Sequence, residues 1–268
     1  TMEFLCGVRR GRTTGAPLVF SIKNKDSRLD DLERTPPVYR PRPGHADLSG
    51  SIKWLTTDCR ETLERASARE TASRVGAGAI ARCLLRHFGI ETFGFTRQIL
   101  DARTDVTVRE ENWREIKALR DASDTYCPDE AVTERQREII RQAKIDKDTV
   151  GGKVETHVFG LPPGIGSSMD WTTKLDARIA YAVMGIQAFK AVEMGMGVGV
   201  ASKPGSEVHD PIYFDSSKMN DPCLGFTRPT NNAGGTEGGM SPPPACSITT
   251  PWPSRSPGAS ATSSRVTQ

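Results

Sequence analysis

The sequence lacks a long apolar run and a strong excess of charge of either sign. Its longest uncharged stretch with substantial apolar content covers 179–189, eleven residues, whereas a membrane-spanning helix needs about 20. Lys and Arg number 36 against 33 Asp and Glu, a net charge of +3 in 268 residues. This balance is unusual for a chain whose main task is binding nucleic acid. We therefore expect neither a membrane nor a nucleic-acid partner, although a basic loop at Arg40 and Arg42 favours the latter.

Paired cysteines are also missing. The six cysteines are scattered at positions 6, 59, 83, 127, 223 and 246, and no two form a CxxC motif. None has metal-ligand spacing with a histidine, so we expect no metal site. The first residues lack the basic head and apolar core of a secretory signal peptide. Scattered reduced thiols without a signal peptide predict a cytoplasmic protein.

Composition changes sharply at Ser241. The 28 residues 241–268 include six Pro, seven Ser and four Thr, and such a segment buries too little apolar surface to offset its ordering entropy. We predict a domain over 1–240 and a disordered tail over 241–268, either natural or translated from a shifted reading frame. The chain also starts abruptly, because residues 3–8 already have a strand pattern.

The pattern between the ends mixes strands and helices without a regular βαβ rhythm. Strand-like segments at 3–8 and 17–23 flank a turn rich in Gly and Thr and predict a hairpin. The other predicted elements are a proline-rich loop at 26–44, helices at 58–87, 128–144 and 175–189, and strands at 90–98 and 152–159. We expect a buried stripe of small residues on the first helix and deep burial of the last one. These elements indicate an α+β fold.

Chemistry-bearing residues gather in the proline-stiffened segment 40–47. Arg42 offers a planar fork for phosphate or carboxylate oxygens. His45 can exchange a proton near neutrality, and Asp47 follows two residues later. An exposed basic loop with an incidental histidine is the alternative, but the combination favours a site that binds an anionic metabolite and transfers a proton through His45.

Two further segments have less specific patterns. Arg65 and Arg69 are four residues apart on the first predicted helix, with Ser67 between them. They could bind an anion or form a solvated face of Arg–Glu pairs. The Gly-rich segment 230–239 lets backbone N–H groups approach a ligand but matches no nucleotide-binding fingerprint. By itself it could be a linker.

Several motifs follow one another in a distinctive order and spacing. They are GVRRGRTTGAP (7–17), RPGHAD (42–47), ERASARETASRV (64–75), DTVGG (148–152), GLPPGIGS (160–167), KLDARIAYAVMGIQAFKAVE (174–193) and TNNAGGTEGGMS (230–241). By these motifs, over about residues 3–241, the sequence resembles the chorismate synthase family.

The resemblance implies a fold and a reaction. The fold is a β-α-β sandwich with core helices between antiparallel sheets, incomplete in this chain. The reaction is the 1,4-elimination of phosphate from 5-enolpyruvylshikimate 3-phosphate to give chorismate, a lyase step of the shikimate pathway of aromatic amino acid biosynthesis. It requires reduced FMN without net redox change, with NAD(P)H as a possible reductant in some relatives. Members are cytoplasmic homotetramers.

The resemblance also assigns site residues. His45 takes the place of a proton donor, and Arg42, Ser67 and Arg69 take the places of substrate ligands. The flavin-contacting positions are Arg65, Ala66, Ser67, Gln187, Ala188 and Gly238.

Departures from the family pattern concern single residues and both ends. Lys147 and Ala191 replace usual glycines, while Ala66 and Gln187 are tolerated variants. No GESHG motif with its second catalytic histidine, and no KPIPT flavin-phosphate segment, occurs in the chain. We therefore expect an inactive fragment; the alternative is a non-catalytic remnant that binds ligand or oligomerises.

Overall fold

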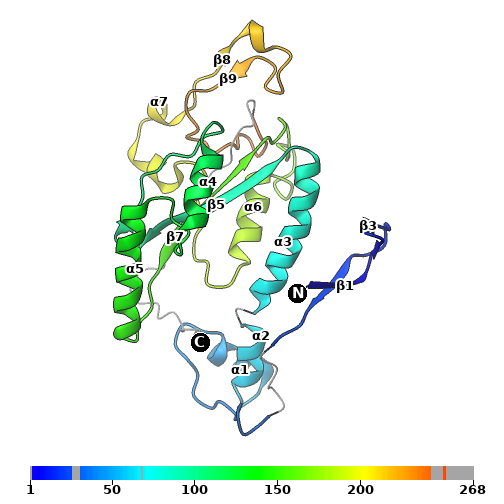
Figure 1. Ribbon diagram of the computed structural model, residues 1–268, viewed down its shortest axis with the longest axis vertical. Helices are drawn as coiled ribbons and strands as arrows, with labels where there is room; N and C mark the ends of the chain where they lie inside the picture. Colours follow the sequence, from blue (N-terminus) through cyan, green and yellow to red (C-terminus); the bar gives the residue numbers. More distant parts are fainter. Residues whose placement is uncertain (1, 26–30, 68, 243–249, 252–268) are drawn as a thin grey trace. The chain divides into compact units, whose positions relative to one another are not determined.

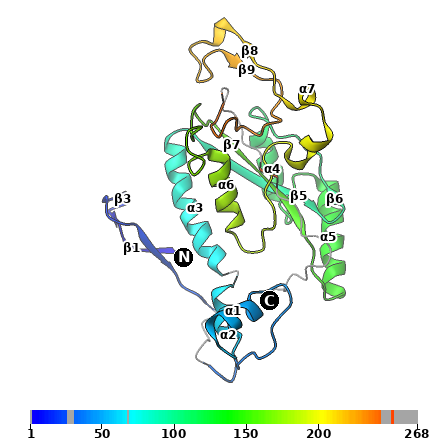
Figure 2. The ribbon, with the colours of Figure 1, turned by 180° about the vertical axis from the view of Figure 1, so that it is seen from behind.

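A computed structural model describes residues 2–25, 31–67, 69–242 and 250–251 (Figures 1 and 2). The chain divides into two compact units, Thr1–Cys83 and Leu84–Gln268, each with small sheets of its own. Most of the predicted tail, 243–249 and 252–268, lies outside the described residues. Ser241 at its start is buried, with 3% of its surface exposed.

The first unit opens with the expected hairpin. β1 (Met2–Cys6) pairs antiparallel with β4 (Val19–Ile22). Between them β2 (Val8–Arg9) and β3 (Arg12–Thr13) form a second, shorter ladder around the turn at Gly11. The hairpin prediction at 3–8 and 17–23 is thus confirmed.

The single helix predicted over 58–87 is wrong. The structure has α2 (Arg60–Arg65) and α3 (Glu70–His87), with a break between them, and α1 (Asp47–Trp54), which the sequence pattern did not predict. At the break, the Ser67 hydroxyl accepts a hydrogen bond from the Arg69 N–H at 3.4 Å. Serine side chains compete in this way for backbone groups and favour helix ends over helix interiors.

The buried stripe expected on α3 is also wrong. Gly76 is the one buried residue of α3, and Val75 and Leu84 expose 66% and 61% of their surface. The Phe20 ring of β4 lies so close to Gly76 that a Cβ there would come within 2.8 Å of it. Contact with the hairpin therefore covers one small spot, and the rest of the apolar face stays exposed.

The second unit is built on a sheet with strand order β10-β7-β5-β6, antiparallel throughout. The members of the sheet are β5 (Glu91–Ile99), β6 (Ala102–Arg103), β7 (Gly152–Phe159) and β10 (Thr250–Pro251). The strands predicted at 90–98 and 152–159 are confirmed. Gly89 ends α3 in a left-handed conformation, and the Ile90 N–H donates to the Leu85 carbonyl at 3.0 Å, a common helix termination.

Two helices pack beside this sheet (Figure 1). α5 (Glu130–Ile145) confirms the helix predicted at 128–144, and the Asp129 side chain caps it by accepting from the Val132 N–H at 3.2 Å. α4 (Trp113–Ala122) was not predicted. It contributes Trp113 to the core, where the indole stacks on Phe159 with ring centroids 5.3 Å apart. The buried cluster consists of Phe93, Phe95, Val108, Trp113, Ile116 and Phe159.

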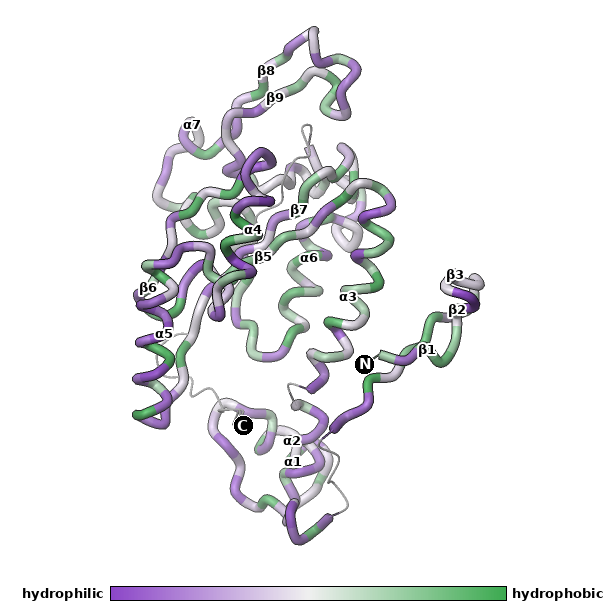
Figure 3. The backbone as a smooth tube through the Cα atoms, in the orientation of Figure 1, coloured by the Kyte–Doolittle hydropathy of each residue, from purple (hydrophilic) through white to green (hydrophobic). Residues whose placement is uncertain are grey.

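The helix predicted at 175–189 is shorter than expected and is not deeply buried. α6 (Leu175–Met184) contains no buried residue, and Tyr181 exposes 86% of its surface. Figure 3 shows the largely apolar colouring of this helix. Beyond it lie η1 (Gly197–Ser202), α7 (Gly205–Val208), β8 (Tyr213–Phe214), η2 (Ser216–Lys218) and β9 (Phe226–Thr227), with β8 and β9 paired antiparallel.

The mixture of helices and small antiparallel sheets confirms the α+β class. Lys147, which replaces a usual glycine, has a φ of +55°, a conformation that glycine adopts more readily. Within the described part of the chain, no helix has the length and apolar character needed to cross a membrane.

Replacing Phe95 by alanine should destabilise the second unit by about 3–5 kcal/mol, because a buried ring leaves a cavity in the core. Phe95 exposes 2% of its surface, whereas the control residue, Phe88, exposes 67%. Urea unfolding followed by tryptophan fluorescence measures both variants. Equal losses for Phe95→Ala and Phe88→Ala would contradict the assignment of the core.

Candidate active site

The proline-rich loop that carries Arg42 and His45 is tied to the start of α2. The Asp58 carboxylate accepts from the backbone N–H groups of Val38 at 2.8 Å and Arg60 at 2.9 Å. The Arg60 guanidinium donates to the Pro36 carbonyl at 2.8 Å. One aspartate therefore serves both the loop and the helix start, which holds the loop against the helix.

Asp47 organises the residues of this loop. It is fully buried and accepts from Arg42 through Nε at 2.8 Å and Nη2 at 3.1 Å. The Arg42 backbone N–H also donates to it at 3.0 Å, and His45 Nδ1 lies 2.5 Å from Oδ1. Burial raises the pKa of Asp47, but the bonds from Arg42 and His45 outweigh it and lower the pKa to about 2. The carboxylate is thus ionised wherever the protein is folded near neutral pH.

This geometry defines the reactive atoms of the loop. With Nδ1 of His45 directed at a carboxylate, Nε2 is the ring nitrogen left to exchange a proton with a ligand. The His45 side chain is 14% exposed. Arg42 directs Nε and Nη2 at Asp47, and Nη1 has no recorded partner among the described residues. One face of the guanidinium fork therefore stays available to an anion.

The second group of predicted residues lies at the break between α2 and α3. Arg69 pairs with Glu64 at 2.8 Å and is 45% exposed, so part of the alternative, a face of Arg–Glu pairs, is present. Ser67 lies two residues before it in the same turn. Arg65 and Ala66 line a shallow cavity of about 490 Å³. Its other lining residues are Trp54, Glu61 and Thr62.

Gln187, Ala188 and Gly238 belong to the second unit, whereas the other predicted site residues belong to the first. Gln187 and Ala188 follow the end of α6, and Ala188 has a φ of +68°, which is strained for a residue with a Cβ. Gly238 has a φ of +57°, and nothing lies within 4 Å of the position where a Cβ would stand.

The Gly-rich segment 230–239 is a fixed structure rather than the linker that its composition allowed. The buried Asp210 carboxylate accepts from Thr230 Oγ1 at 2.6 Å, the Asn232 N–H at 2.7 Å and the Ala233 N–H at 2.9 Å. Sequence reasoning missed Asp210 because its donors lie about twenty residues away along the chain. An aspartate beside a histidine gave no signal of that contact.

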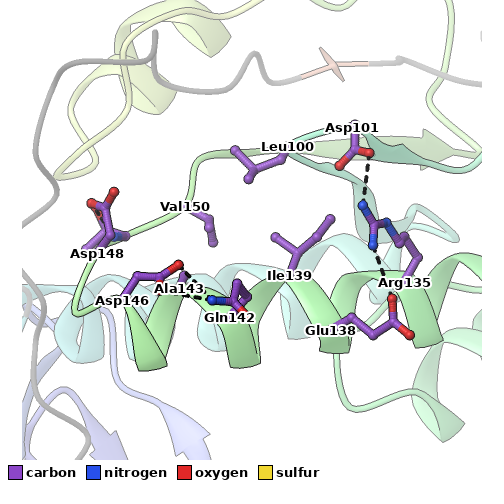
Figure 4. A pocket seen from close by; sticks show the side chains of 11 residues that line it. Leu100, Asp101, Arg135, Glu138, Ile139, Gln142, Ala143, Asp146, Asp148 and Val150 are labelled. Carbon is purple, nitrogen blue, oxygen red and sulfur yellow. Dashed lines mark hydrogen bonds and ion pairs between the residues drawn. The ribbon is translucent and has the colours of Figure 1, made fainter.

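A second cavity, of about 480 Å³, lies along α5 (Figure 4). Arg135 reaches Asp101 at 3.4 Å and Glu138 at 3.1 Å on its rim. None of the predicted site residues lines it. Among the described residues, no group of three or more His, Cys, Asp or Glu is placed to hold a metal ion.

Comparison with known proteins identifies relatives with one description. A family model described as chorismate synthase matches residues 1–250. The chain is 45% identical to the chorismate synthase of Desulforamulus reducens over 250 residues, covering 89% of this chain and 62% of that protein. It is 44% identical to that of Pelobacter propionicus, with 90% and 63% covered. The chain thus spans about three fifths of the length of these curated relatives.

A solved structure has the same fold. The crystal structure of a chorismate synthase superposes with a TM-score of 0.80 at 35% sequence identity, covering 94% of this chain and 70% of that one. This agreement extends the α+β assignment to the arrangement that the sequence resemblance implied.

Asp47→Asn should lower the free energy of unfolding by about 2 kcal/mol at pH 7. The folded pKa, about 2, lies below the ordinary 3.8, so the carboxylate stabilises the fold above about pH 4. This contribution disappears as the pH falls toward 2, and wild type and variant should converge there. Urea titrations at pH 7 and pH 3 measure it. Asp105→Asn, at a side chain 90% exposed, is the control, and a pH-independent difference would contradict the assignment.

Proposed function

Because this chain belongs to the chorismate synthase family, we propose that it carries the proton donor and part of the substrate and flavin sites of that lyase. The reaction is the 1,4-elimination of phosphate from 5-enolpyruvylshikimate 3-phosphate to chorismate. The observation that carries the proposal is the cluster of Arg42 and His45 on one buried carboxylate, Asp47. It lies within the residues that the family model matches.

The substrate carries one phosphate and two carboxylates, and arginine forks suit such groups. Arg42 offers Nη1 to one anionic group while Asp47 fixes the rest of its guanidinium. Arg69 is half exposed and can exchange its surface partner Glu64 for a ligand, with the Ser67 hydroxyl beside it. His45 holds a proton at Nε2 and can deliver it to a bound group.

The residues assigned to reduced FMN are compatible with a planar, anionic ligand. Gly238 leaves open space where a side chain would stand, and Arg65 and Ala66 line a shallow cavity. When bound, reduced FMN supplies the electrons that the elimination requires and recovers them without net oxidation. Ser67, Gln187 and Ala188 complete the proposed contacts. A homotetramer, a cytoplasmic location and NAD(P)H as a reductant stay predictions from the resemblance.

We propose further that these 268 residues are inactive by themselves. The chain contains no GESHG motif, and loss of a general acid or base typically costs about 10²–10⁴-fold in rate. A non-catalytic role in ligand binding or oligomerisation is the second candidate. The exposed apolar residues of α6, Tyr181 and Met184 among them, favour it because exposed apolar surface often marks an interface.

Turnover by the isolated chain should be absent or reduced at least about 10²-fold relative to a full-length relative. Anaerobic assays with reduced FMN and 5-enolpyruvylshikimate 3-phosphate, read out as released phosphate and chorismate absorbance, measure it. Turnover at the rate of a full-length relative would overturn the proposal of inactivity. Failure to bind both substrate and FMN would overturn the assigned site.

Binding of 5-enolpyruvylshikimate 3-phosphate should weaken about tenfold or more in Arg42→Ala, because a charge-assisted hydrogen bond is lost. Arg42→Lys keeps the charge but loses the fork, so it should restore binding only in part. Isothermal titration calorimetry measures both variants. The control is Arg103→Ala, at an exposed side chain of the second unit. Unchanged affinity in a folded Arg42→Ala would remove Arg42 from the substrate site.

A further inference from the structure

We propose that Asp210 is a positioning residue that holds the segment 230–239 in its flavin-binding shape. This inference rests on the proposed function, because FMN is the ligand assigned to that segment. Asp210 belongs to the stretch between α7 and β8 and is not one of the residues that the resemblance assigns to the site. It would act through the backbone of the segment rather than by touching the flavin.

The contacts of Asp210 define its role. The two oxygens of one carboxylate receive three donors: Thr230 Oγ1 and the Asn232 N–H on Oδ1, and the Ala233 N–H on Oδ2. The distances of 2.6 Å, 2.7 Å and 2.9 Å are those of charge-assisted bonds. Asp210 therefore fixes the first four residues of the segment from outside it.

The carboxylate is specialised for this task by burial and charge. Asp210 is 8% exposed, and burial raises its pKa. The hydrogen bonds from Ala233, Thr230 and Asn232 outweigh burial and lower the pKa below its ordinary value. The carboxylate therefore stays ionised at neutral pH, and its donors already occupy the positions that a substrate or proton would need.

The anchored half of the segment also packs on the chain that leads away from Gln187 and Ala188. The Met196 N–H donates to the Asn232 carbonyl at 2.8 Å. Gly195 approaches so closely that a Cβ there would lie 2.0 Å from the Asn232 oxygen. Asp210 and Gly195 thus hold Asn232 from two sides, eight residues along the chain from Gln187.

The other half of the segment is attached to α6 and the loop before it. The Gly239 carbonyl accepts from the Leu175 N–H at 2.8 Å, and the Ser241 N–H donates to the Ile165 carbonyl at 2.9 Å. Arg228 and Glu237 form an ion pair that closes the segment on itself. Gly238, the assigned flavin contact, lies between these anchors and presents open space. Its position therefore depends on anchors at both ends.

The test compares Asp210→Asn with Asp215→Asn. Asparagine at 210 presents one NH₂ group where a carboxylate oxygen accepts, so it must release Thr230 and Asn232 or Ala233. Asp215 caps Ser217 in η2 through a backbone N–H at 3.0 Å and has no recorded bond to 230–239, which makes it a matched control. FMN binding is measured by quenching of flavin fluorescence, and amide protection at 232–233 by hydrogen exchange.

We expect Asp210→Asn to weaken FMN binding about tenfold, in line with the loss of a supporting contact behind a ligand-binding group. Protection of the 232–233 amides should fall at least about tenfold, and Asp215→Asn should change neither quantity. Thr230→Val, which removes one donor only, keeps the test valid where Asp210→Asn fails to fold. It should weaken FMN binding by a few-fold.

The outcomes separate the two proposals. Wild-type chain that binds no FMN overturns the flavin assignment of the proposed function, and with it the ligand assigned to this segment. Wild-type binding that Asp210→Asn or Thr230→Val leaves unchanged overturns the role of Asp210 alone. A lower melting temperature with unchanged FMN affinity also overturns it, since that pattern is a purely structural effect.

Discussion

The proposed chemistry depends on one buried carboxylate, that of Asp47. An unpaired charge at a fully buried position would be costly, so the fold retains this carboxylate only together with Arg42 and His45. Each partner is thereby held in one orientation. The histidine keeps one ring nitrogen for a ligand, and the arginine keeps one edge of its fork. Substrate recognition and proton transfer thus have a single electrostatic origin.

The two units use the same device at different places. In the first, Asp58 accepts backbone N–H groups from the proline-rich loop and from α2. In the second, Asp210 accepts backbone N–H groups from the Gly-rich segment. Segments rich in Pro or Gly have few backbone bonds of their own, because they lie outside helices and sheets. A carboxylate from elsewhere in the chain replaces those bonds and gives an irregular loop a defined shape.

Local sequence patterns predicted the elements that depend on local physics. The hairpin, the long strands and α5 follow from alternation, periodicity and the Asp129 cap. The break at Ser67 was missed because apolar periodicity continues across it, whereas one hydroxyl bond decides against the helix. Burial of α3 and α6 was wrong because an apolar face predicts that a partner exists, not that this chain supplies it. Arg42 and His45 could be singled out by residue type, but Asp210 acts across about twenty residues and leaves no local signal.

The bond between Asp210 and Thr230 makes these two positions interdependent. Changes in contacting residues are generally not additive, and the coupling has either sign. A substitution of Thr230 that is harmful beside an aspartate could be neutral once position 210 is no longer acidic, because the hydroxyl then has no charge to satisfy. Among variants of this chain, such epistasis would appear as correlated replacement at two sites that sequence distance alone would treat as unrelated.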